Sequence, residues 1–153
     1  MNWKSSRSAT QNARDALPRL VQKYFKAGRH AAAGKYSAKQ LHGFRLKTKR
    51  FRYTLELFQP LYGQSLEKSL KSLHSLQGVL GKISDYATIR DLLKGDKAIE
   101  ASLDRATKRK VREFQIMWAE FDAEGQLERW ETLLSGRNPD EPRLVPVRRR
   151  ASR

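Results

Sequence analysis

A dense group of basic side chains lies between Lys39 and Arg52, and no acidic residue interrupts it before Glu56. Like charges this close repel one another, so the pattern favours a ligand of opposite charge. Arginine binds phosphate oxygens through two parallel hydrogen bonds, and lysine supplies a point charge. These residue types therefore predict the binding of a polyanion. The basic residues of the group are Lys39, Arg45, Lys47, Lys49, Arg50 and Arg52.

A helix sorts this segment into two faces. At about 100° per residue, one side is apolar and packs on a core, while the other is basic. The alternative is an ordinary solvated surface, but such surfaces usually carry acidic partners four residues from the bases, and this run lacks them. We therefore prefer a polyanion site. The apolar side holds Leu41, Phe44, Phe51, Leu55 and Phe58, and the basic side holds His42, Arg45, Lys49 and Arg52.

The chain has three histidines, and only His42 lies within the basic face. A protonated imidazole can donate hydrogen bonds to phosphate oxygens, while neighbouring cations oppose its protonation until an anion binds. We therefore expect a pH-dependent contact at His42.

A second, weaker polar stripe follows the leucine-rich segment of the chain. Along a helix it lies beside the leucines, so it either borders a groove shared with the basic helix or forms the rim of a bundle. Gln77 falls on the leucine side, where a buried amide needs partners, and it would orient a basic side chain. The stripe consists of Lys71, His74, Lys82 and Asp85.

The sequence shows no apparatus for catalysis. It lacks paired carboxylates in an apolar setting, a glycine-rich loop after a strand, and a metal-binding spacing of His, Cys or Asp. It also has no acidic cluster that would hold magnesium for phosphate chemistry. We therefore expect a protein that is not an enzyme and that has no cofactor and no metal.

Composition agrees with an anionic ligand. The chain of 153 residues suits one domain, and its 32 Lys and Arg against 16 Asp and Glu give a net charge of +16. The absence of Cys fits a reducing compartment, so we expect the cytoplasm. No apolar run is long enough to span a membrane. The Ser- and Arg-rich start shares its composition with organelle transit peptides, so targeting stays open.

Apolar residues recur at helical spacing, and no alternating run predicts a strand. The expected fold class is all-α: an antiparallel bundle of four to five helices over residues 1–136, followed by a basic, disordered tail over residues 137–153. The first helix is expected from Ala9 to about Lys26, with a kink or a start at Pro18.

Caps and glycines mark the later helices. The second is expected from the N-cap Ser37 to about Gln59, because Pro60 should end it. A third follows Gly63 and reaches Gly95, with a leucine stripe. A fourth begins at the N-cap Asp96. Its aromatic end, with Met117, Trp118 and Phe121, is expected in the core, and a closing helix runs from about Ala123 to Leu134.

Two stretches resemble one known family. The run from Leu41 to Phe58 resembles the signature helix of the CHAD domains (conserved histidine α-helical domains), and the run from Ser72 to Leu93 resembles the helix that follows it. The matching residues are His42, Arg45, Lys49, Arg50, Arg52 and Tyr53 in the first run, and Gln77, Gly81 and Asp85 in the second.

The resemblance implies a helical bundle that binds inorganic polyphosphate along a basic groove or pore, without enzymatic activity. Family members typically hold two repeats that face one another, whereas this chain holds a single repeat. A homodimer is therefore expected, with a lone half-site or a different partner chain as alternatives. The expected contacts are Arg45, Lys49, Arg50 and Arg52 to phosphate oxygens, His42 when protonated, the Tyr53 hydroxyl, and Lys71 and Lys82 farther out.

A nucleic-acid backbone, RNA above all, is the alternative ligand, because it offers the same phosphate chemistry. Binding of unpaired bases by stacking needs exposed aromatic side chains among the basic residues. Only Tyr53 is expected there, since the phenylalanines belong to the core. Polyphosphate is therefore the preferred ligand.

Overall fold

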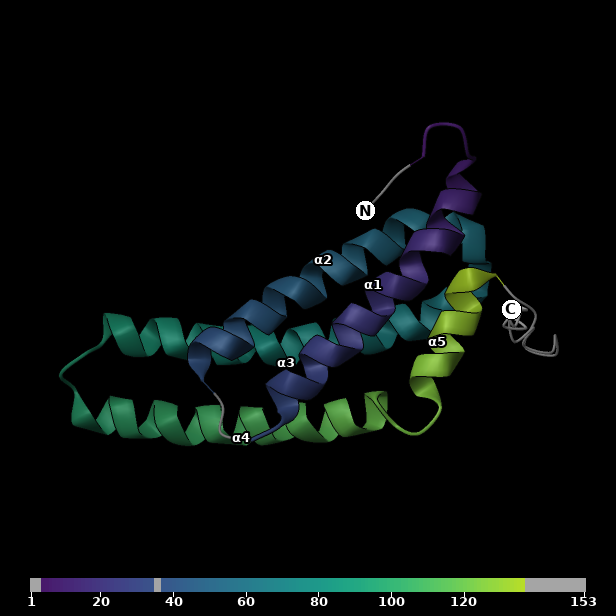
Figure 1. Ribbon diagram of the computed structural model, residues 1–153. Coiled ribbons are helices and arrows are strands. Elements are labelled where there is room, and N and C mark those ends of the chain that lie inside the picture. The colour runs from purple at the N-terminus through teal and green to yellow at the C-terminus, as the bar shows by residue number, and fades with distance from the viewer. Residues whose placement is uncertain (1–3, 35–36, 137–153) are drawn as a thin grey trace, which may run out of the picture.

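The computed structural model describes residues 4–34 and 37–136, and all regular structure within those ranges is helical (Figure 1). The all-α prediction is therefore confirmed. The tail expected over residues 137–153 lies outside the described residues. The elements are α1 (Ala9–Ala32), α2 (Ala38–Tyr62), the short 3-10 helix η1 (Gly63–Leu66), α3 (Glu67–Leu92), α4 (Lys97–Phe121) and α5 (Gln126–Ser135).

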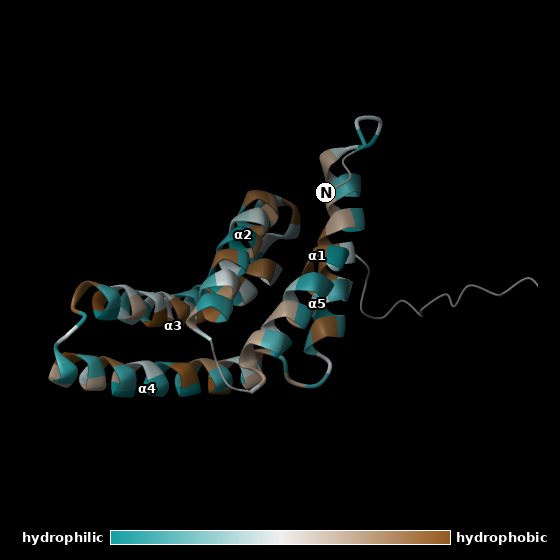
Figure 2. Ribbon diagram, turned by 60° about the vertical axis from the view of Figure 1, so that its left-hand side comes forward, coloured by the Kyte–Doolittle hydropathy of each residue, from teal (hydrophilic) through white to brown (hydrophobic). Residues whose placement is uncertain are grey.

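The helices form an antiparallel bundle in which α2 has two neighbours (Figure 1). α1 packs against α2 and α5, whereas α3 packs against α2 and α4. Each long helix carries both hydrophobic and hydrophilic residues along its length, as Figure 2 shows. α2 therefore presents two separate flanks, one toward α1 and one toward α3.

Aromatic residues from four helices form the centre of the core. Tyr24 of α1 stacks on Phe51 of α2, with ring centroids 4.3 Å apart. Trp118 of α4 lies edge-on to Tyr24 at 5.7 Å, and Trp130 of α5 lies 5.7 Å from Phe51. Rings at these distances stabilise a core beyond their area alone. The leucine stripe also lies in the core, with Leu66, Leu70, Leu73, Leu76 and Leu80 buried.

Two helices begin at their predicted N-caps, and α1 begins at Ala9 as expected. The Ser37 hydroxyl accepts a hydrogen bond from a first-turn N–H of α2 at 3.2 Å. The Asp96 carboxylate accepts two from the first turn of α4, at 3.0 and 3.1 Å. Ser8 forms a capping box at the start of α1. Each cap satisfies backbone donors that the first turn leaves unpaired.

The first helix is longer than the sequence predicts. α1 passes through Pro18 and ends at Ala32 rather than near Lys26. A proline removes one backbone hydrogen bond, and packing on two neighbouring helices compensates for that loss. Gly28 lies inside α1, and a Cβ there would overlap the Trp118 ring. This glycine allows α1 and α4 to approach closely; it does not end the helix.

The prediction that Pro60 ends the second helix is wrong. α2 continues to Tyr62 and ends at Gly63, whose φ of 57° suits a residue without a side chain. The Tyr62 hydroxyl donates a hydrogen bond to the Leu134 carbonyl at 2.7 Å. This contact with α5 fixes the last turn of α2, so tertiary packing outweighs the local effect of Pro60.

The α3–α4 hairpin extends beyond the core (Figure 1). The buried residues of α3 end at Ile83, and those of α4 begin at Val111. None of the described helices is long and apolar enough to cross a membrane. The end of the hairpin carries exposed apolar residues, namely Ile89, Leu92, Leu93 and Ile99.

Candidate functional site

The basic face of α2 lies along α3. The Nη1 atom of Arg52 is 3.2 Å from Nδ1 of His74. Farther along the two helices, Nε of Arg45 lies 4.0 Å from the position that a Cβ would take on Gly81. At this distance a Cβ would make an ordinary van der Waals contact, so the guanidinium group of Arg45 packs against α3 at Gly81.

A third contact fixes the register of the two helices. Nδ1 of His42 is 3.5 Å from the Ser84 hydroxyl. From His42 to Arg52 the residue numbers on α2 rise as those of their α3 partners fall, so the contact is antiparallel and regular. We call it the α2–α3 seam. It consists of His42, Arg45, Lys49 and Arg52 on α2 and of His74, Gly81 and Ser84 on α3. Lys49 is included because its spacing places it on the same face of α2.

Two arginines of the seam have buried polar atoms without partners. The Nε atoms of Arg45 and Arg52 are buried, and neither has a hydrogen-bond partner among the described residues. The same holds for Oε1 of Gln77 on α3. A buried polar atom without a partner costs on the order of 1–3 kcal/mol. Nε1 of Trp118 in the core is in the same state, so it is the position of the two arginines in the seam that relates them to an anion. The two Nε–H groups could donate to the oxygens of an anion.

Arg52 is held in place by three neighbours. It contacts His74, forms an ion pair with Glu56 at 3.0 Å, and places its guanidinium carbon 4.7 Å from the centre of the Tyr53 ring. Because a guanidinium can only donate, Nδ1 of His74 accepts, and the imidazole is neutral in this contact. Glu56 is an acidic partner four residues from a base, so the expectation that the basic face has none is wrong for Arg52.

Tyr53 lies at the outer edge of the basic face. Its side chain is half exposed, and Nζ of Lys49 is 5.9 Å from the centre of its ring. Lys49 and Arg52 therefore both lie near one aromatic ring, which attracts cations. Lys49 and Arg45 form no ion pair with any carboxylate of the described residues. Asp85, which is exposed, is the residue after Ser84.

Two of the predicted contact residues are exposed lysines of α3. Nζ of Lys71 pairs with Glu67 at 2.8 Å, and this hydrogen bond holds the pKa of Glu67 below its usual range. Lys82 is exposed and follows Gly81 directly. Its side chain therefore leaves α3 about 100° away from the direction of Arg45. Lys71 is three residues before His74 and shares its face of α3, whereas Lys82 points in another direction.

Arg50 lies on the other flank of α2. Together with Lys47 and with Lys23 of α1, it lines a hollow between α1 and α2. Arg50 and Arg52 are two positions apart, which is about 200° around a helix, so they face in different directions. The structure thus separates Arg50 from the other basic residues of the predicted site. It brings together His42, Arg45, Lys49 and Arg52, with Tyr53 beside them.

The sequence reasoning did not predict Ser84 as part of the site, nor the place of Gly81 opposite Arg45. The spacing gave a signal, because Gly81 is seven residues after His74 and Ser84 is three after Gly81, and residues three or seven apart share a helix face. The sequence could not show which residue of α2 lies opposite each of them, because that depends on how the helices pack.

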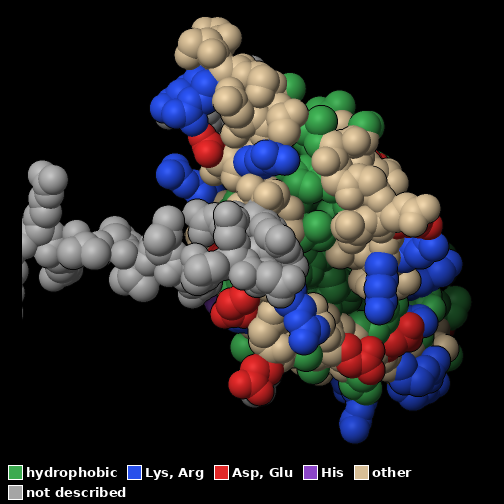
Figure 3. Space-filling model, turned by 90° about the vertical axis from the view of Figure 1, so that its right-hand side faces the viewer, with side chains coloured by type: hydrophobic (Ala, Val, Ile, Leu, Met, Phe, Trp, Pro, Cys, Tyr) green, Lys and Arg blue, Asp and Glu red, His purple; other side chains and the backbone are tan. Residues whose placement is uncertain are grey.

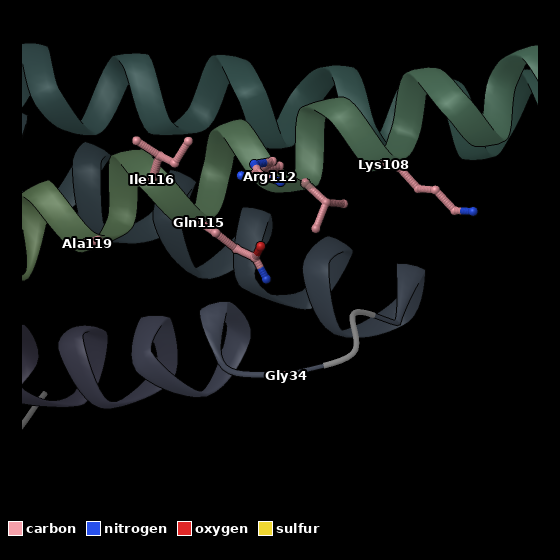
Figure 4. A pocket seen from close by; sticks show the side chains of 7 residues that line it. Gly34, Lys108, Arg112, Gln115, Ile116 and Ala119 are labelled. Atoms are coloured by element: carbon pink, nitrogen blue, oxygen red, sulfur yellow. The ribbon is translucent and has the colours of Figure 1, made fainter.

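A second hollow, beside α4, differs from the seam. A hollow of about 590 Å³ lies where the end of α1 meets α4 (Figure 4). There Gln115 donates to the Ala32 carbonyl at 3.2 Å, and Lys108 extends away from the other labelled side chains. The face drawn in Figure 3 shows acidic side chains among basic ones. Within residues 4–34 and 37–136, no cluster of His, Cys, Asp or Glu could hold a metal ion.

A family model described as the CHAD domain matches residues 2–94. This match includes α1, α2, η1 and α3, and therefore the whole α2–α3 seam. The chain belongs to the CHAD domain family. CHAD domains are linked in general to polyphosphate binding, and the family is generally non-catalytic. α4 and α5 lie beyond the matched residues. No curated protein and no solved structure matched this chain.

Proposed function

We propose that this CHAD domain binds inorganic polyphosphate through the α2–α3 seam and does so without catalysing a reaction. The observation that carries the proposal is the pair of buried Nε atoms on Arg45 and Arg52, which have no partner among the described residues. Phosphate oxygens accept hydrogen bonds from guanidinium groups in a bidentate manner. An anion in the seam would therefore satisfy donors that the described chain leaves unpaired.

The length of the seam suits a linear polyanion. From His42 to Arg52 the helix rises by about 15 Å, at about 1.5 Å per residue. A chain of condensed phosphates along this line would meet several cations in succession and release their counterions. The binding free energy would then come from many moderate contacts rather than from one enclosed pocket.

Each predicted contact has a role in this arrangement. Arg45 and Arg52 donate to phosphate oxygens, Lys49 supplies a point charge, and His42 donates when it is protonated. The Tyr53 ring lies near Lys49 and Arg52, so its hydroxyl would donate as well. A longer polyphosphate that passes around the helices would reach the outer cations Arg50, Lys71 and Lys82.

RNA is the alternative ligand, and the packing of the aromatic residues disfavours it. Phe44, Phe51 and Phe58 are all buried in the core. Tyr53 is thus the one exposed ring beside the seam among the described residues, which is little for stacking of successive bases. Polyphosphate should displace labelled RNA when the two are compared at equal phosphate concentration; displacement in the opposite order would favour RNA.

The decisive variant is Arg45→Ala with Arg52→Ala. Loss of two charge-assisted hydrogen-bonding groups, at about 1.5–3 kcal/mol each, should weaken polyphosphate binding about a hundredfold or more. The slope of log affinity against log salt concentration should also fall by about two, since each phosphate contact contributes about one. Affinity is measured by titration at several salt concentrations, with helical circular dichroism as the check on folding.

A matched control is Arg105→Ala with Arg109→Ala. Both residues are exposed on α4. This variant therefore has the same net charge as the variant without Arg45 and Arg52, but its seam is intact. Its affinity should stay close to that of the original protein. Equal weakening in both variants would show that overall charge, rather than the seam, attracts the ligand. The variant Arg45→Lys with Arg52→Lys, which keeps the charges, should bind with intermediate affinity.

We also propose that two copies of the chain associate on one polyphosphate. A single seam contacts the ligand from one side, and a second copy would supply cations on the other. Light scattering after gel filtration should then show a doubled protein mass with polyphosphate present. An unchanged mass with retained ligand would indicate a half-site that acts alone.

A further inference from the structure

The face of α2 that points away from the core carries a stripe of exposed apolar side chains. Its members are spaced seven, four and four residues apart. This spacing keeps them within about 80° of one another around a helix. Leu57 is 73% exposed, and the other three are between 41% and 50% exposed. We call this group the outer stripe; it consists of Leu46, Tyr53, Leu57 and Leu61.

The outer stripe is open to solvent over the described part of the chain. α2 packs against α1, α3 and η1, and its buried residues, such as Phe51 and Leu55, lie on the opposite side of the helix. Single exposed apolar residues are common on protein surfaces, whereas a contiguous group marks an interaction site. The stripe therefore calls for a partner with an apolar surface.

Cations border the outer stripe. Arg50 lies within the arc of the stripe, and Lys47 lies beside it on the α1 side. Both are exposed, and neither forms an ion pair with a carboxylate of the described residues. Glu56 is the one acidic residue of α2, and it is paired with Arg52. The surroundings of the stripe are therefore positively charged.

Apolar side chains among cations select for a partner that is both apolar and anionic. A phosphate chain or a nucleic-acid backbone pairs with the cations, but it offers nothing to aliphatic leucines. A second copy of the chain would bring its own cations against these, and like charges repel. A bilayer with anionic headgroups meets both demands, because its charged surface lies directly above hydrocarbon.

The end of the α3–α4 hairpin differs from the outer stripe, because it is apolar without being basic. Leu92 and Leu93 are 77% and 44% exposed, close to the values of Leu57 and Leu61. Between Asp91 and Lys97, however, two aspartates balance two lysines. This region has similar apolar exposure but no excess of positive charge, so an anionic surface should not attract it.

We propose that the outer stripe docks the protein on an anionic lipid surface. α2 lies flat on the bilayer, with Leu57 and Leu61 at the boundary between headgroups and acyl chains. Arg50 and Lys47 extend to the headgroup phosphates, while their aliphatic stems stay near the leucines. The binding free energy then comes from buried apolar area and from charge together. The stripe uses none of the arginines of the seam, so docking and polyphosphate binding are separate properties.

The experiment measures co-sedimentation of the full chain with vesicles. One set contains phosphatidylglycerol mixed with phosphatidylcholine, and the other contains phosphatidylcholine alone. The test variant is Leu57→Ser with Leu61→Ser, and its matched control is Leu92→Ser with Leu93→Ser. Neither variant changes the net charge, and all four side chains are exposed, so both should keep the helical circular dichroism of the original protein.

The original protein should bind the anionic vesicles and not the neutral ones. The variant without Leu57 and Leu61 should lose about tenfold in affinity for anionic vesicles, in line with the apolar area withdrawn from the bilayer. It should keep its affinity for polyphosphate. The control should bind anionic vesicles within about twofold of the original protein, since its changes are elsewhere.

A second pair of variants tests the charges. Lys47→Ala with Arg50→Ala should weaken binding to anionic vesicles about tenfold, because each cation near such a surface adds to the attraction. Arg105→Ala with Arg109→Ala has the same net charge and should weaken it by less than about threefold, since salt screens charges far from the membrane. The seam variant without Arg45 should still bind the vesicles.

Three results would overturn the proposal. Equal vesicle binding by the two leucine variants would show that the stripe does not enter the bilayer. Equal binding to both kinds of vesicle would show that the headgroup charge is not recognised. A doubled mass in light scattering without vesicles, abolished by Leu57→Ser with Leu61→Ser, would assign the stripe to a second copy of the chain. None of these results depends on polyphosphate, so the docking site can fail while the seam stands.

Discussion

The two flanks of α2 both carry cations but hold them in different ways. On the α3 side, Arg52 is packed among His74, Glu56 and Tyr53, and its side chain is only 14% exposed. On the α1 side, Lys47 and Arg50 are exposed around an apolar hollow. One basic segment of sequence thus becomes two surfaces with different physical properties.

Burial determines what each flank can do. Half-buried guanidinium groups are fixed in direction, and a hydrogen bond to them is worth more because the local dielectric is low. Exposed lysines and arginines lose more side-chain freedom when they bind, and salt screens them. The seam is therefore suited to directed phosphate contacts, whereas the exposed cations on the α1 side suit only weak and screened attraction of anions.

The largest difference between the flanks should come from single substitutions tested with polyphosphate. Arg45→Ala removes a half-buried donor of the seam and should weaken binding about tenfold, in line with one charge-assisted hydrogen bond. Arg50→Ala removes the same charge from the other flank and should change affinity by less than about twofold, as a screened exposed charge does. Titration calorimetry at one salt concentration measures both.

The comparison between the flanks fails if the two variants weaken binding equally. Polyphosphate would then wrap α2 and contact both sides, as the family resemblance suggested when it grouped Arg50 with Arg45. Because both substitutions remove one arginine from the same helix, the change in net charge is matched within the pair.

Much of the fold followed from local chemistry that the sequence displays. Side-chain caps at Ser37 and Asp96 fixed two helix starts, and the leucine spacing of α3 predicted its buried stripe. Pro60 was misread, because it lies in a helix that neighbouring helices stabilise. Pro18 lies inside α1, which excludes a helix start there. Propensity is a weak guide where packing supplies most of the helical stability.

The site was only partly predictable, for a geometric reason. Helical periodicity alone groups His42, Arg45, Lys49 and Arg52, and the structure brings these together. The same periodicity separates Arg50 from them. The resemblance to the family motif nevertheless led us to place Arg50 in the same site. The sequence could not show which helix packs on the basic face of α2, or the register that places His74 beside Arg52. Both depend on contacts between residues that are distant in sequence.

A smaller effect should follow from removing the acidic partner of the seam. Glu56 pairs with Arg52 and competes with any incoming anion for that guanidinium. Glu56→Gln should therefore raise polyphosphate affinity by about threefold, which is within the range for a partly exposed ion pair. Glu113→Gln is the matched control, because it removes the partner of Lys110 on α4, outside the seam. An equal rise in both variants would mean that net charge alone is responsible.

The smallest expected effect concerns pH, and it involves both histidines of the seam. His42 is exposed at one end, whereas His74 accepts a hydrogen bond from Arg52 at the other. Protonation of His42 adds a donor for phosphate. Protonation of His74 ends its contact with Arg52, since both groups would then be donors, and so frees that guanidinium. Both changes favour the anion at lower pH.

Polyphosphate affinity should therefore rise by about two- to threefold from pH 8 to pH 6, the range in which histidine usually titrates. The sign follows because the anion binds the protonated form of either imidazole more tightly. His42→Ala should remove part of the rise and His74→Ala the rest, while His30→Ala, outside the seam on α1, should leave the profile unchanged. A flat profile in the original protein would remove both imidazoles from the site, and the binding free energy would then rest on the arginines and Lys49 alone.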